Sequence, residues 1–240
     1  MEELQKKYES QILDLVEACH RCAELNYVTS CGGNLSIRTE DNLLLITPTK
    51  TLKRKMTFDD ICVMELDGNV LYAKEGKRPT GEWPFHTRIM KKRPDVKAIV
   101  HAHPPYMTGF AIAHSDVLSL PILPEPIIEI GPMRNVPYGT PLSEDLSLKF
   151  DDVIEDSNGF LMQNHGVLFC SANHIGEAVE SLTMAEEMAH SIFVAQVMGG
   201  FKMIPDSYVK EMDDVIAVRN LKMPGAAGKY QSATELYGLK

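Results

Sequence analysis

The sequence has no long hydrophobic run. No apolar stretch approaches the ~20 residues that a membrane-spanning helix needs. Residues 1–9 are charged and helical in character, which is unlike a signal peptide. We therefore expect a soluble protein that stays in the cytoplasm.

Positive charge is also scarce, because 24 Lys and Arg residues face 33 Asp and Glu residues and leave a net charge of −9. Nucleic-acid-binding proteins gather Lys and Arg on one face, so this composition argues against a nucleic-acid partner. A membrane-surface partner is not indicated either. The composition favours a small-molecule substrate.

Cysteine is too sparse and too scattered for a disulfide framework: the chain has 5, an odd number, which suits a reducing compartment. Cys19 and Cys22 could be interpreted as a redox or zinc pair. They lie three residues apart in an expected amphipathic helix, and no second Cys-x-x-Cys completes a site. We interpret them as residues of that helix.

The length of 240 residues and the hydrophobic content of 44% allow one α/β domain with a sizeable core, and two small domains would also fit. No internal repeat is evident. We expect one domain over residues 1–223, followed by a mobile tail over residues 224–240 with little packing periodicity.

Hydrophobic periodicity and turn residues predict the order of the elements. Helices are expected at residues 3–25, 81–92 (with Thr80 as N-cap), 106–113, 143–156 and 173–198. Strands are expected from residue 35, at 43–46, 61–66, 70–73 and 96–100, and on both sides of residues 163–166. The proline-rich residues 117–142 are expected to form an irregular surface segment with short strands near 127–130 and 136–138.

The residues that most clearly indicate a catalytic or metal-binding site are histidines, two of them at the end of an expected strand. His101 and His103 are two residues apart, so on a strand both rings project from the same face. His165 interrupts a buried apolar run beside a glycine and is the third candidate. Taken singly, each could be an ordinary core or surface histidine. Together, three imidazoles would leave a tetrahedral zinc ion one open position, which is typical of a catalytic site.

Glu82 is the candidate acid/base, because a carboxylate beside such a metal can move a proton next to a carbonyl group. An acidic residue at a helix start is also an ordinary capping residue. His86, one turn later, is the best substitute ligand. The free N–H groups at the helix start, near Gly81, would favour a substrate anion such as phosphate.

Two further segments could bind an anion. The Gly-Gly-Asn turn at residues 32–34 can bring backbone N–H groups close to a ligand, although it could equally be a plain turn. The Thr-Pro-Thr-Lys segment at residues 47–50 offers hydroxyls and an ammonium group. Alternatively, Lys50 belongs to a solvated cluster with Lys53, Arg54 and Lys55.

With these pieces in place, the chain resembles the class II aldolase/adducin family over nearly its whole length, and within it the L-fuculose-1-phosphate aldolase branch. The segments that carry the resemblance are Gly-Gly-Asn-Leu-Ser-Ile-Arg (32–38), Ile-Thr-Pro-Thr (46–49), Pro-Thr-Gly-Glu-Trp (79–83) with His86, Ile-Val-His-Ala-His-Pro (99–104) and Gln-Asn-His-Gly (163–166). The resemblance implies a single-domain, three-layer α/β/α fold with a mixed, largely antiparallel sheet. It also implies a homotetramer with the site at a subunit interface.

The same resemblance implies roles for individual residues. One zinc ion per chain would be bound by His101, His103 and His165, with Glu82 as an occasional ligand and as the acid/base. The phosphate group would lie in a cradle formed by Gly33, Asn34, Thr49, Lys50, Thr80 and Gly81.

The sequence departs from that branch at three places. Lys50 stands where the branch usually has Gly, and Gly81 stands where it has a second Ser, so the substrate anion could differ. Near Glu125 the branch carries a proton-donating Tyr that has no counterpart here; Tyr230 or Tyr237 from the tail of a neighbouring subunit could replace it.

Four functions therefore compete. A retro-aldol lyase that forms dihydroxyacetone phosphate and an aldehyde is favoured by Glu82, whereas a pentulose-phosphate 4-epimerase would prefer Asp there. A decarboxylase of a phosphorylated 3-oxo sugar acid, of the 3-dehydro-4-phosphotetronate type, shares the zinc site and is kept open by Lys50. A non-catalytic, adducin-like scaffold would have lost its metal-binding histidines.

Overall fold

One eight-stranded sheet forms the centre of the molecule, in the order β4-β3-β2-β1-β5-β8-β7-β6. The computed structural model describes residues 2–221, 223–224, 229–230 and 232–239. All neighbouring strands pair antiparallel except β6 and β7, which are parallel. The strands are β1 (Asn34–Arg38), β2 (Leu43–Ile46), β3 (Cys62–Glu65), β4 (Val70–Tyr72), β5 (Ala98–Ala102), β6 (Arg134–Val136), β7 (Gly159–Met162) and β8 (Gly166–Ser171).

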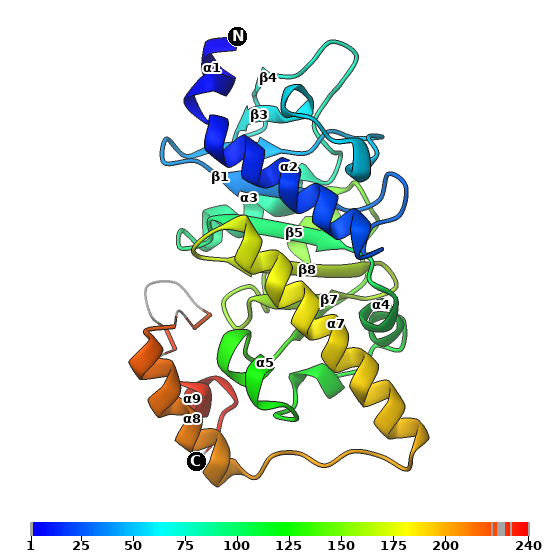
Figure 1. Ribbon diagram of the computed structural model, residues 1–240, viewed down its shortest axis with the longest axis vertical. Coiled ribbons are helices and arrows are strands. Elements are labelled where there is room, and N and C mark those ends of the chain that lie inside the picture. Colours follow the sequence, from blue (N-terminus) through cyan, green and yellow to red (C-terminus); the bar gives the residue numbers. More distant parts are fainter. Residues whose placement is uncertain (1, 222, 225–228, 231, 240) are drawn as a thin grey trace.

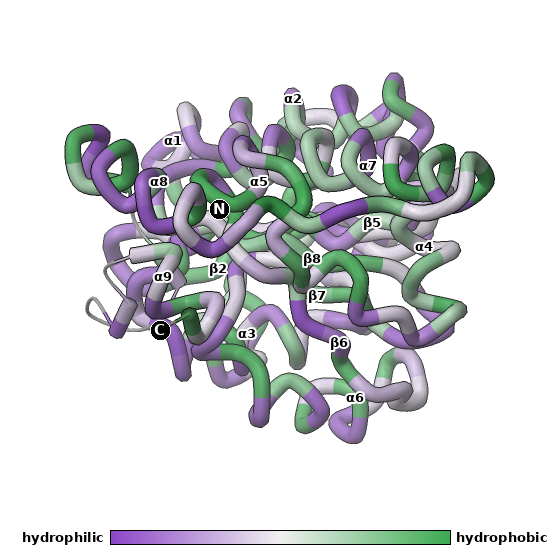
Figure 2. Tube along the Cα trace, turned by 90° about the horizontal axis from the view of Figure 1, so that it is seen from below, coloured by the Kyte–Doolittle hydropathy of each residue, from purple (hydrophilic) through white to green (hydrophobic). Residues whose placement is uncertain are grey.

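Helices cover both faces of this sheet, as Figures 1 and 2 show. The longer helices are α2 (Glu9–Glu24), α3 (Trp83–Lys92), α4 (Pro105–Ile112), α7 (Ile175–Val197) and α8 (Asp206–Arg219). The shorter ones are α1 (Glu2–Lys7), α5 (Pro124–Glu129), α6 (Glu144–Leu148) and α9 (Ala233–Leu236), together with the 3₁₀ turns η1 (Lys53–Lys55), η2 (Phe58–Asp60) and η3 (Val117–Ser119).

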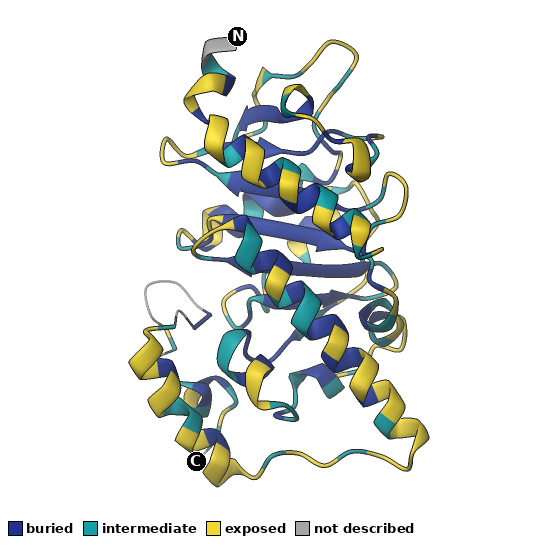
Figure 3. Cartoon of the chain, viewed as in Figure 1, coloured by how far each residue is buried: buried dark blue, intermediate teal, exposed yellow. Residues whose placement is uncertain are grey.

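Each face of the sheet has its own hydrophobic core. On one face α2, α4 and α7 pack against alternate strand residues such as Leu35, Val100 and Phe169. On the other face α3 and α6 pack against the intervening residues, including Ile99 and Leu168. Because β5 and β8 are covered on both sides, every residue of these two strands is buried (Figure 3). This arrangement confirms the predicted fold class.

A smaller apolar cluster joins α5, α8 and α9 at the end of the sheet near β6, with Ile127, Ile216 and Leu236 among its buried members. Helix α8 was not among the elements expected from the sequence. Residues 225–228, 231 and 240 of the expected tail lie outside the described residues. Within the described part of that tail, α9 is packed, with Ala233 fully buried.

Several expected elements have different bounds. The helix expected over residues 3–25 is interrupted at Tyr8, where φ is −113° and ψ is 27°. The helix expected from Gly81 begins at Trp83, with Glu82 rather than Thr80 in the N-cap position. The helix expected over residues 143–156 ends as an α-helix at Leu148 and continues in turns.

The prediction for the proline-rich segment was wrong in its first part. Residues 124–129 form helix α5 rather than a strand, and Ile127 and Ile130 are buried, so this segment is not simply a surface loop. Pro124 stands in the first turn of α5. Proline is accepted there because the N–H group that it lacks would have no partner within the helix. The second expected strand exists as β6, shifted to Arg134–Val136.

Candidate metal centre and active site

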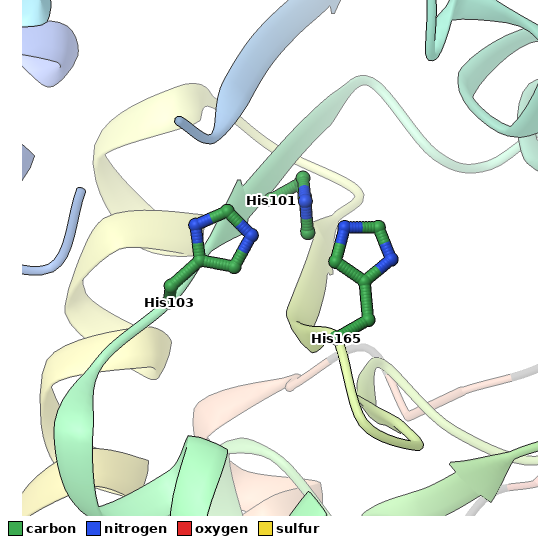
Figure 4. A group of neighbouring side chains, drawn as sticks. All are labelled: His101, His103 and His165. Carbon is green, nitrogen blue, oxygen red and sulfur yellow. The ribbon is translucent and has the colours of Figure 1, made fainter. Parts of the chain in front are cut away.

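The three predicted histidines converge at one end of the central strands. One ring nitrogen from each of His101, His103 and His165 lies within 4.8 Å of those of the other two (Figure 4). His101 is in β5, His103 follows that strand, and His165 lies in the turn between β7 and β8. Residues 64 positions apart in the chain meet because β8 pairs directly with β5, with His101 opposite Leu168.

Hydrogen bonding decides which nitrogen of His101 is free. Its Nδ1 lies 2.8 Å from the carbonyl oxygen of Val167, so Nδ1 carries the proton and donates it. Its Nε2 is buried and has no hydrogen-bond partner in the structure, and the same holds for Nδ1 of His165. Buried polar atoms without partners are uncommon, and at a histidine cluster such atoms are typical of a site that binds a metal ion.

Two glycines, Gly33 and Gly166, allow the backbone to pass close to the histidine residues. A Cβ atom at Gly33 would lie 2.7 Å from the carbonyl oxygen of His101, and φ there is +68°, which side chains rarely adopt. A Cβ atom at Gly166 would lie 2.4 Å from Cδ2 of His103. Any larger residue at either position would push the strands or the ring apart, so the geometry of the cluster depends on both glycines.

The imidazoles are held neutral. Burial lowers the pKa of His101 well below its ordinary value, and the charges of His103 and His165 would lower it further. Burial is also the main reason that the pKa of His103 falls to about 4. Burial lowers the pKa of His165 too, while the Glu82 carboxylate acts in the opposite direction. Neutral imidazoles with free ring nitrogens are the form in which histidine binds a metal.

Glu82 closes one side of the cluster. Its Oε2 lies 3.4 Å from Nε2 of His101, and its Oε1 lies 3.4 Å from Nε2 of His165. The residue is 7% exposed. A carboxylate at this distance can approach a bound ion or move away from it with a small side-chain rotation. The described residues therefore fit a divalent metal: three neutral nitrogens, one adjacent carboxylate, and an orphaned nitrogen aimed at the centre.

A buried hydrogen-bond chain positions this carboxylate. Asn34 donates from Nδ2 to Oε2 of Glu82 at 2.8 Å, and its Oδ1 accepts from Nε2 of His86 at 2.5 Å. Nδ1 of His86 lies 2.8 Å from the hydroxyl of Ser36. Burial lowers the pKa of His86 to about 3, so this ring is neutral. His86 thus uses both nitrogens away from the histidine group, and it is not the substitute ligand that the sequence suggested.

The residues expected to form the phosphate cradle are only partly brought together. The Asn34 amide is directed at Glu82, and the Thr80 hydroxyl accepts from the N–H of Glu82 at 3.3 Å. Thr49 and Lys50 instead line a cavity of about 280 Å³ together with Gly76, Lys77 and Arg78, which we call the basic cavity. The backbone N–H of Thr80 donates to the carbonyl oxygen of Thr47 at 3.1 Å, so this N–H group already has a partner within the protein.

The sequence reasoning missed Lys77 and Arg78. The signal was present, because both residues precede the Pro-Thr-Gly-Glu segment, and Pro48 forms an isolated bridge with Pro79 that brings the two loops together. Lys50 adopts φ of 52°, a left-handed conformation that favours glycine. This conformation gives a physical reason for the glycine that the resembling branch usually has there.

The alternative that places Lys50 in a solvated cluster with Lys53, Arg54 and Lys55 is met only in part. Arg54 and Lys55 are exposed, but Lys53 is 2% exposed and does not belong to a solvated cluster. The proton-donor candidates of the tail lie elsewhere within this chain. Tyr230 donates to Oδ1 of Asp156 at 2.6 Å, and burial raises the pKa of Tyr237 within the cluster around α8 and α9.

A cavity of about 810 Å³ lies between α2 and α7 and is not part of this site. The charged residues of its lining are mostly acidic, with Asp14, Glu17 and Glu180 among them. Cys19 and Cys22 are buried on the core side of α2, and burial raises the pKa of the Cys22 thiol to about 12. No described helix is both long and apolar enough to cross a bilayer.

Comparison with known proteins gives a family match. The sequence model for the "Class II Aldolase and Adducin N-terminal domain" matches residues 13–193. This stretch contains every residue of the histidine site and of the basic cavity.

Individual relatives carry two different names. The chain is 30% identical to the 3-oxo-tetronate 4-phosphate decarboxylase of Haemophilus influenzae, over 80% of this chain and 90% of that protein. It is 32% identical to the L-fuculose phosphate aldolase of Methanococcus maripaludis, over 78% of this chain and 97% of that protein. A solved L-fuculose 1-phosphate aldolase superposes with a TM-score of 0.76 at 25% identity, covering 88% of this chain and 97% of that one.

Proposed function

The chain belongs to the class II aldolase and adducin family, and from this we propose that it is a zinc-dependent lyase that cleaves a sugar phosphate by a retro-aldol reaction. The substrate would be L-fuculose 1-phosphate or a related ketose 1-phosphate, and the products dihydroxyacetone phosphate and an aldehyde. The observation that carries the proposal is the convergence of three neutral histidines beside a buried carboxylate.

In this proposal His101, His103 and His165 would hold the ion, and a bound ion would supply Lewis-acid stabilisation of negative charge on the substrate. Glu82 carries the proton chemistry. Overall, cleavage moves a proton from the hydroxyl group of the carbon that becomes the aldehyde to the carbon that becomes part of dihydroxyacetone phosphate. Glu82 would give the proton to that carbon in the cleavage direction and remove it in the synthetic direction. Asn34 keeps the carboxylate in place from one side.

Buried side chains exclude water from part of this centre. His101 is fully buried, and Phe85 packs its ring edge-on at 5.6 Å between centroids. A carboxylate in such surroundings acts on a bound substrate with little competition from solvent. The basic cavity would hold the substrate phosphate through Lys50, Lys77 and Arg78, because charged donors bind phosphate oxygens more strongly than neutral ones.

A second function is kept open by the number of cations near the site. Lys53 is a buried cation in addition to those of the basic cavity. A phosphorylated 3-oxo sugar acid carries a carboxylate as well as a phosphate group, and decarboxylation of such an acid needs the same metal and the same proton transfer. The relative in Haemophilus influenzae carries the name of a decarboxylase of this kind.

One experiment separates the two. The zinc-loaded protein is incubated with a panel of ketose 1-phosphates and phosphorylated 3-oxo sugar acids, and dihydroxyacetone phosphate and carbon dioxide are measured in parallel. Aldolase activity predicts dihydroxyacetone phosphate from a ketose 1-phosphate without carbon dioxide. Decarboxylase activity predicts carbon dioxide from a phosphorylated 3-oxo sugar acid, together with an equal amount of dihydroxyacetone phosphate when the acid is 3-oxo-tetronate 4-phosphate, and release of neither product would contradict both proposals.

We further propose that the chain works in the cytoplasm as a homotetramer with the site at a subunit interface. Large apolar side chains are exposed at the C-terminal end of α7 and just after it, including Val197 at 75% and Met198 at 82% (Figure 3). All five cysteines are unpaired, which suits a reducing compartment. Sedimentation of the protein and of a Val197→Glu variant tests the assembly; identical masses corresponding to a monomer would contradict it.

A further inference from the structure

Glu186 is a buried carboxylate that the proposed chemistry does not use. It lies in α7 and is 6% exposed, whereas its neighbour Glu187 is exposed. Both oxygens of its carboxylate have partners: Oε1 accepts the backbone N–H of Tyr106 at 2.9 Å, and Oε2 accepts that of Met107 at 2.8 Å. Burying a carboxylate is unfavourable unless it is hydrogen-bonded, so these two contacts are the reason that Glu186 can lie inside the molecule.

Both donors belong to the first turn of helix α4, which begins at Pro105. The first N–H groups of a helix have no partner within the helix, and they carry partial positive charge. The residue in the N-cap position is Pro104, which has no side-chain acceptor to offer them. Glu186 lies 80 residues beyond Tyr106 in the chain and caps the helix in place of a local residue.

The start of α4 is joined directly to one of the three histidines. His103 is followed at once by Pro104 and Pro105, so the course of its backbone depends on where the helix begins. The pairing of β5 with β8 ends at Ala102, one residue earlier. The backbone N–H of His103 donates instead to the carbonyl oxygen of Tyr27 at 2.7 Å. His103 is therefore held from one side by this bond and from the other side by α4.

The other end of α4 contacts the turn that carries His165. The backbone N–H of Asn164 donates to the carbonyl oxygen of Ala111 at 3.3 Å. His114, just after the helix, donates from Nε2 to Oδ1 of Asn164 at 2.6 Å. Helix α4 thus begins directly after His103 and ends against the residue that precedes His165. A shift of this helix would change the separation of the two rings, whose centroids lie 5.5 Å apart.

We propose that Glu186 is a positioning residue for the metal centre: it anchors the start of α4 and so holds His103 at the distance from His101 and His165 that a divalent ion needs. Its negative charge also offsets the positive end of α4, which would otherwise disfavour a cation near His103. Glu186 acts through the helix rather than by touching the ion. The inference rests on the metal-dependent lyase proposed above and adds to it a residue outside the group of ligands.

The test measures metal binding rather than turnover. Dissociation constants for Zn²⁺ are measured by competition with a chromophoric chelator on the wild-type protein and on the Glu186→Gln and Glu186→Ala variants. The visible absorption of the same proteins loaded with Co²⁺ reports the geometry of the ligands. Glu187→Gln changes the exposed neighbour and is the matched control. Glu177→Ala removes a carboxylate that accepts from Asn173 near the start of the same helix, and it controls for loss of stability.

We expect Zn²⁺ to bind at least about tenfold more weakly to Glu186→Ala, the usual effect of removing a residue that orients a metal ligand. Glu186→Gln keeps one acceptor oxygen but loses the charge, so its affinity for Zn²⁺ should lie between those of Glu186→Ala and the wild type. The absorption bands of bound Co²⁺ should change in both variants. Glu187→Gln and Glu177→Ala should bind Zn²⁺ within about twofold of wild type, although Glu177→Ala should lower the midpoint of urea unfolding.

Unchanged Zn²⁺ affinity and unchanged Co²⁺ spectra in the Glu186 variants would overturn the inference and leave Glu186 as a helix cap only. Equal weakening of Zn²⁺ binding in Glu177→Ala would also overturn it, because the effect would then follow from lost stability. If Glu186→Ala fails to fold, Glu186→Gln decides. A wild-type protein that binds no Zn²⁺ would reject the inference together with the metal centre. Absence of turnover on every substrate, with Glu186-dependent Zn²⁺ binding intact, would reject the lyase function alone.

Discussion

The histidine site and the basic cavity lie in the same domain but hold their side chains differently. At the histidine site the groups come from strand ends and a helix start, His101 is fully buried, and a hydrogen-bond chain fixes Glu82. In the basic cavity Thr49 to Lys50 and Gly76 to Arg78 lie in loops, and Lys50 and Arg78 are exposed. The groups to which we assign the chemistry are thus the buried ones with fixed partners, and the groups to which we assign substrate choice lie on loops.

This contrast predicts different responses to substitution. Removing a group from the rigid site should have a large effect on catalysis, because its neighbours cannot move to replace it. Removing a group from the basic cavity should have a smaller, substrate-dependent effect.

The largest effect is expected for His103→Ala. Zinc content should fall from about one ion per chain to a small fraction, and kcat/KM should fall by about a thousandfold or more, since the metal supplies several kcal/mol of transition-state stabilisation. Elemental analysis and steady-state kinetics measure both. His190→Ala, which removes an exposed histidine from α7, is the control. Equal zinc content in the two variants would contradict the ligand assignment.

Glu82→Gln should keep the fold and most of the zinc but lose roughly two to four orders of magnitude in kcat, the usual contribution of a positioned acid/base. Asn34→Ala, which removes only the amide that donates to Glu82, should lose about tenfold. Glu40→Gln makes the same change at an exposed position and should leave the rate unchanged. Near-normal turnover by Glu82→Gln would reject the proposed proton transfer.

Lys50→Gly tests the basic cavity. Loss of the ammonium should lower kcat/KM for the native substrate about tenfold to a hundredfold, while activity toward fuculose 1-phosphate could improve. Since φ of Lys50 is 52°, glycine should also stabilise the fold by about 1 kcal/mol. Lys50→Asn tolerates the same backbone conformation and should show the same kinetic loss. Unchanged kinetics with every phosphate and carboxylate substrate would show that Lys50 is an ordinary solvated lysine that binds no substrate.

The smallest effect concerns the anchor of helix α3, which begins next to Glu82. Arg88 and Lys92 of this helix both bind Asp151, and hydrogen bonding to Arg88 is the main reason that the pKa of Asp151 falls from 3.8 to about 2. Because the pKa is lower in the folded state, this stabilisation is complete above about pH 4 and is lost as pH falls toward 2.

Asp151→Asn should therefore destabilise the protein by about 1 kcal/mol at pH 7, and the difference from wild type should vanish near pH 2. Urea unfolding at pH 7, 5 and 3 measures this. The variant should keep its kcat, because the anchor contacts no substrate group. Asp152→Asn, at the neighbouring position, is the control. A difference from wild type that does not change with pH would show that the ion pair is not its source.

Much of the fold was accessible from the sequence because local patterns were strong. The alternation of apolar and polar residues, the Asp-Gly-Asn hairpin at residues 67–69 and the long apolar stripe of α7 correctly predicted most strands and helices. The predictions failed where one signal outweighed another, as at α5, where Pro124 and Pro126 suggested a loop although proline is accepted in a first helical turn.

The candidate site was accessible to a similar degree. The histidines and Glu82 were found because each follows or precedes a recognisable element. The burial of Lys53 was not predicted, since nothing in the basic run at residues 53–55 tells which side chain turns inward. Lys77 and Arg78 were missed because their loop was not connected with Thr49 and Lys50. The role of His86 was likewise hidden, because its partners Asn34 and Ser36 lie about 50 residues away in the chain.

The sequence alone was enough to predict the kind of chemistry that we propose, because the residue types at strand ends and helix starts that suggest metal ligands and an acid/base follow from local geometry. The tertiary structure alone decided which groups act together. Pairing of β1 with β5 sets Asn34 opposite His101, and packing of η1 against α2 buries Lys53. Both depend on contacts between distant segments, whose energies no local pattern encodes.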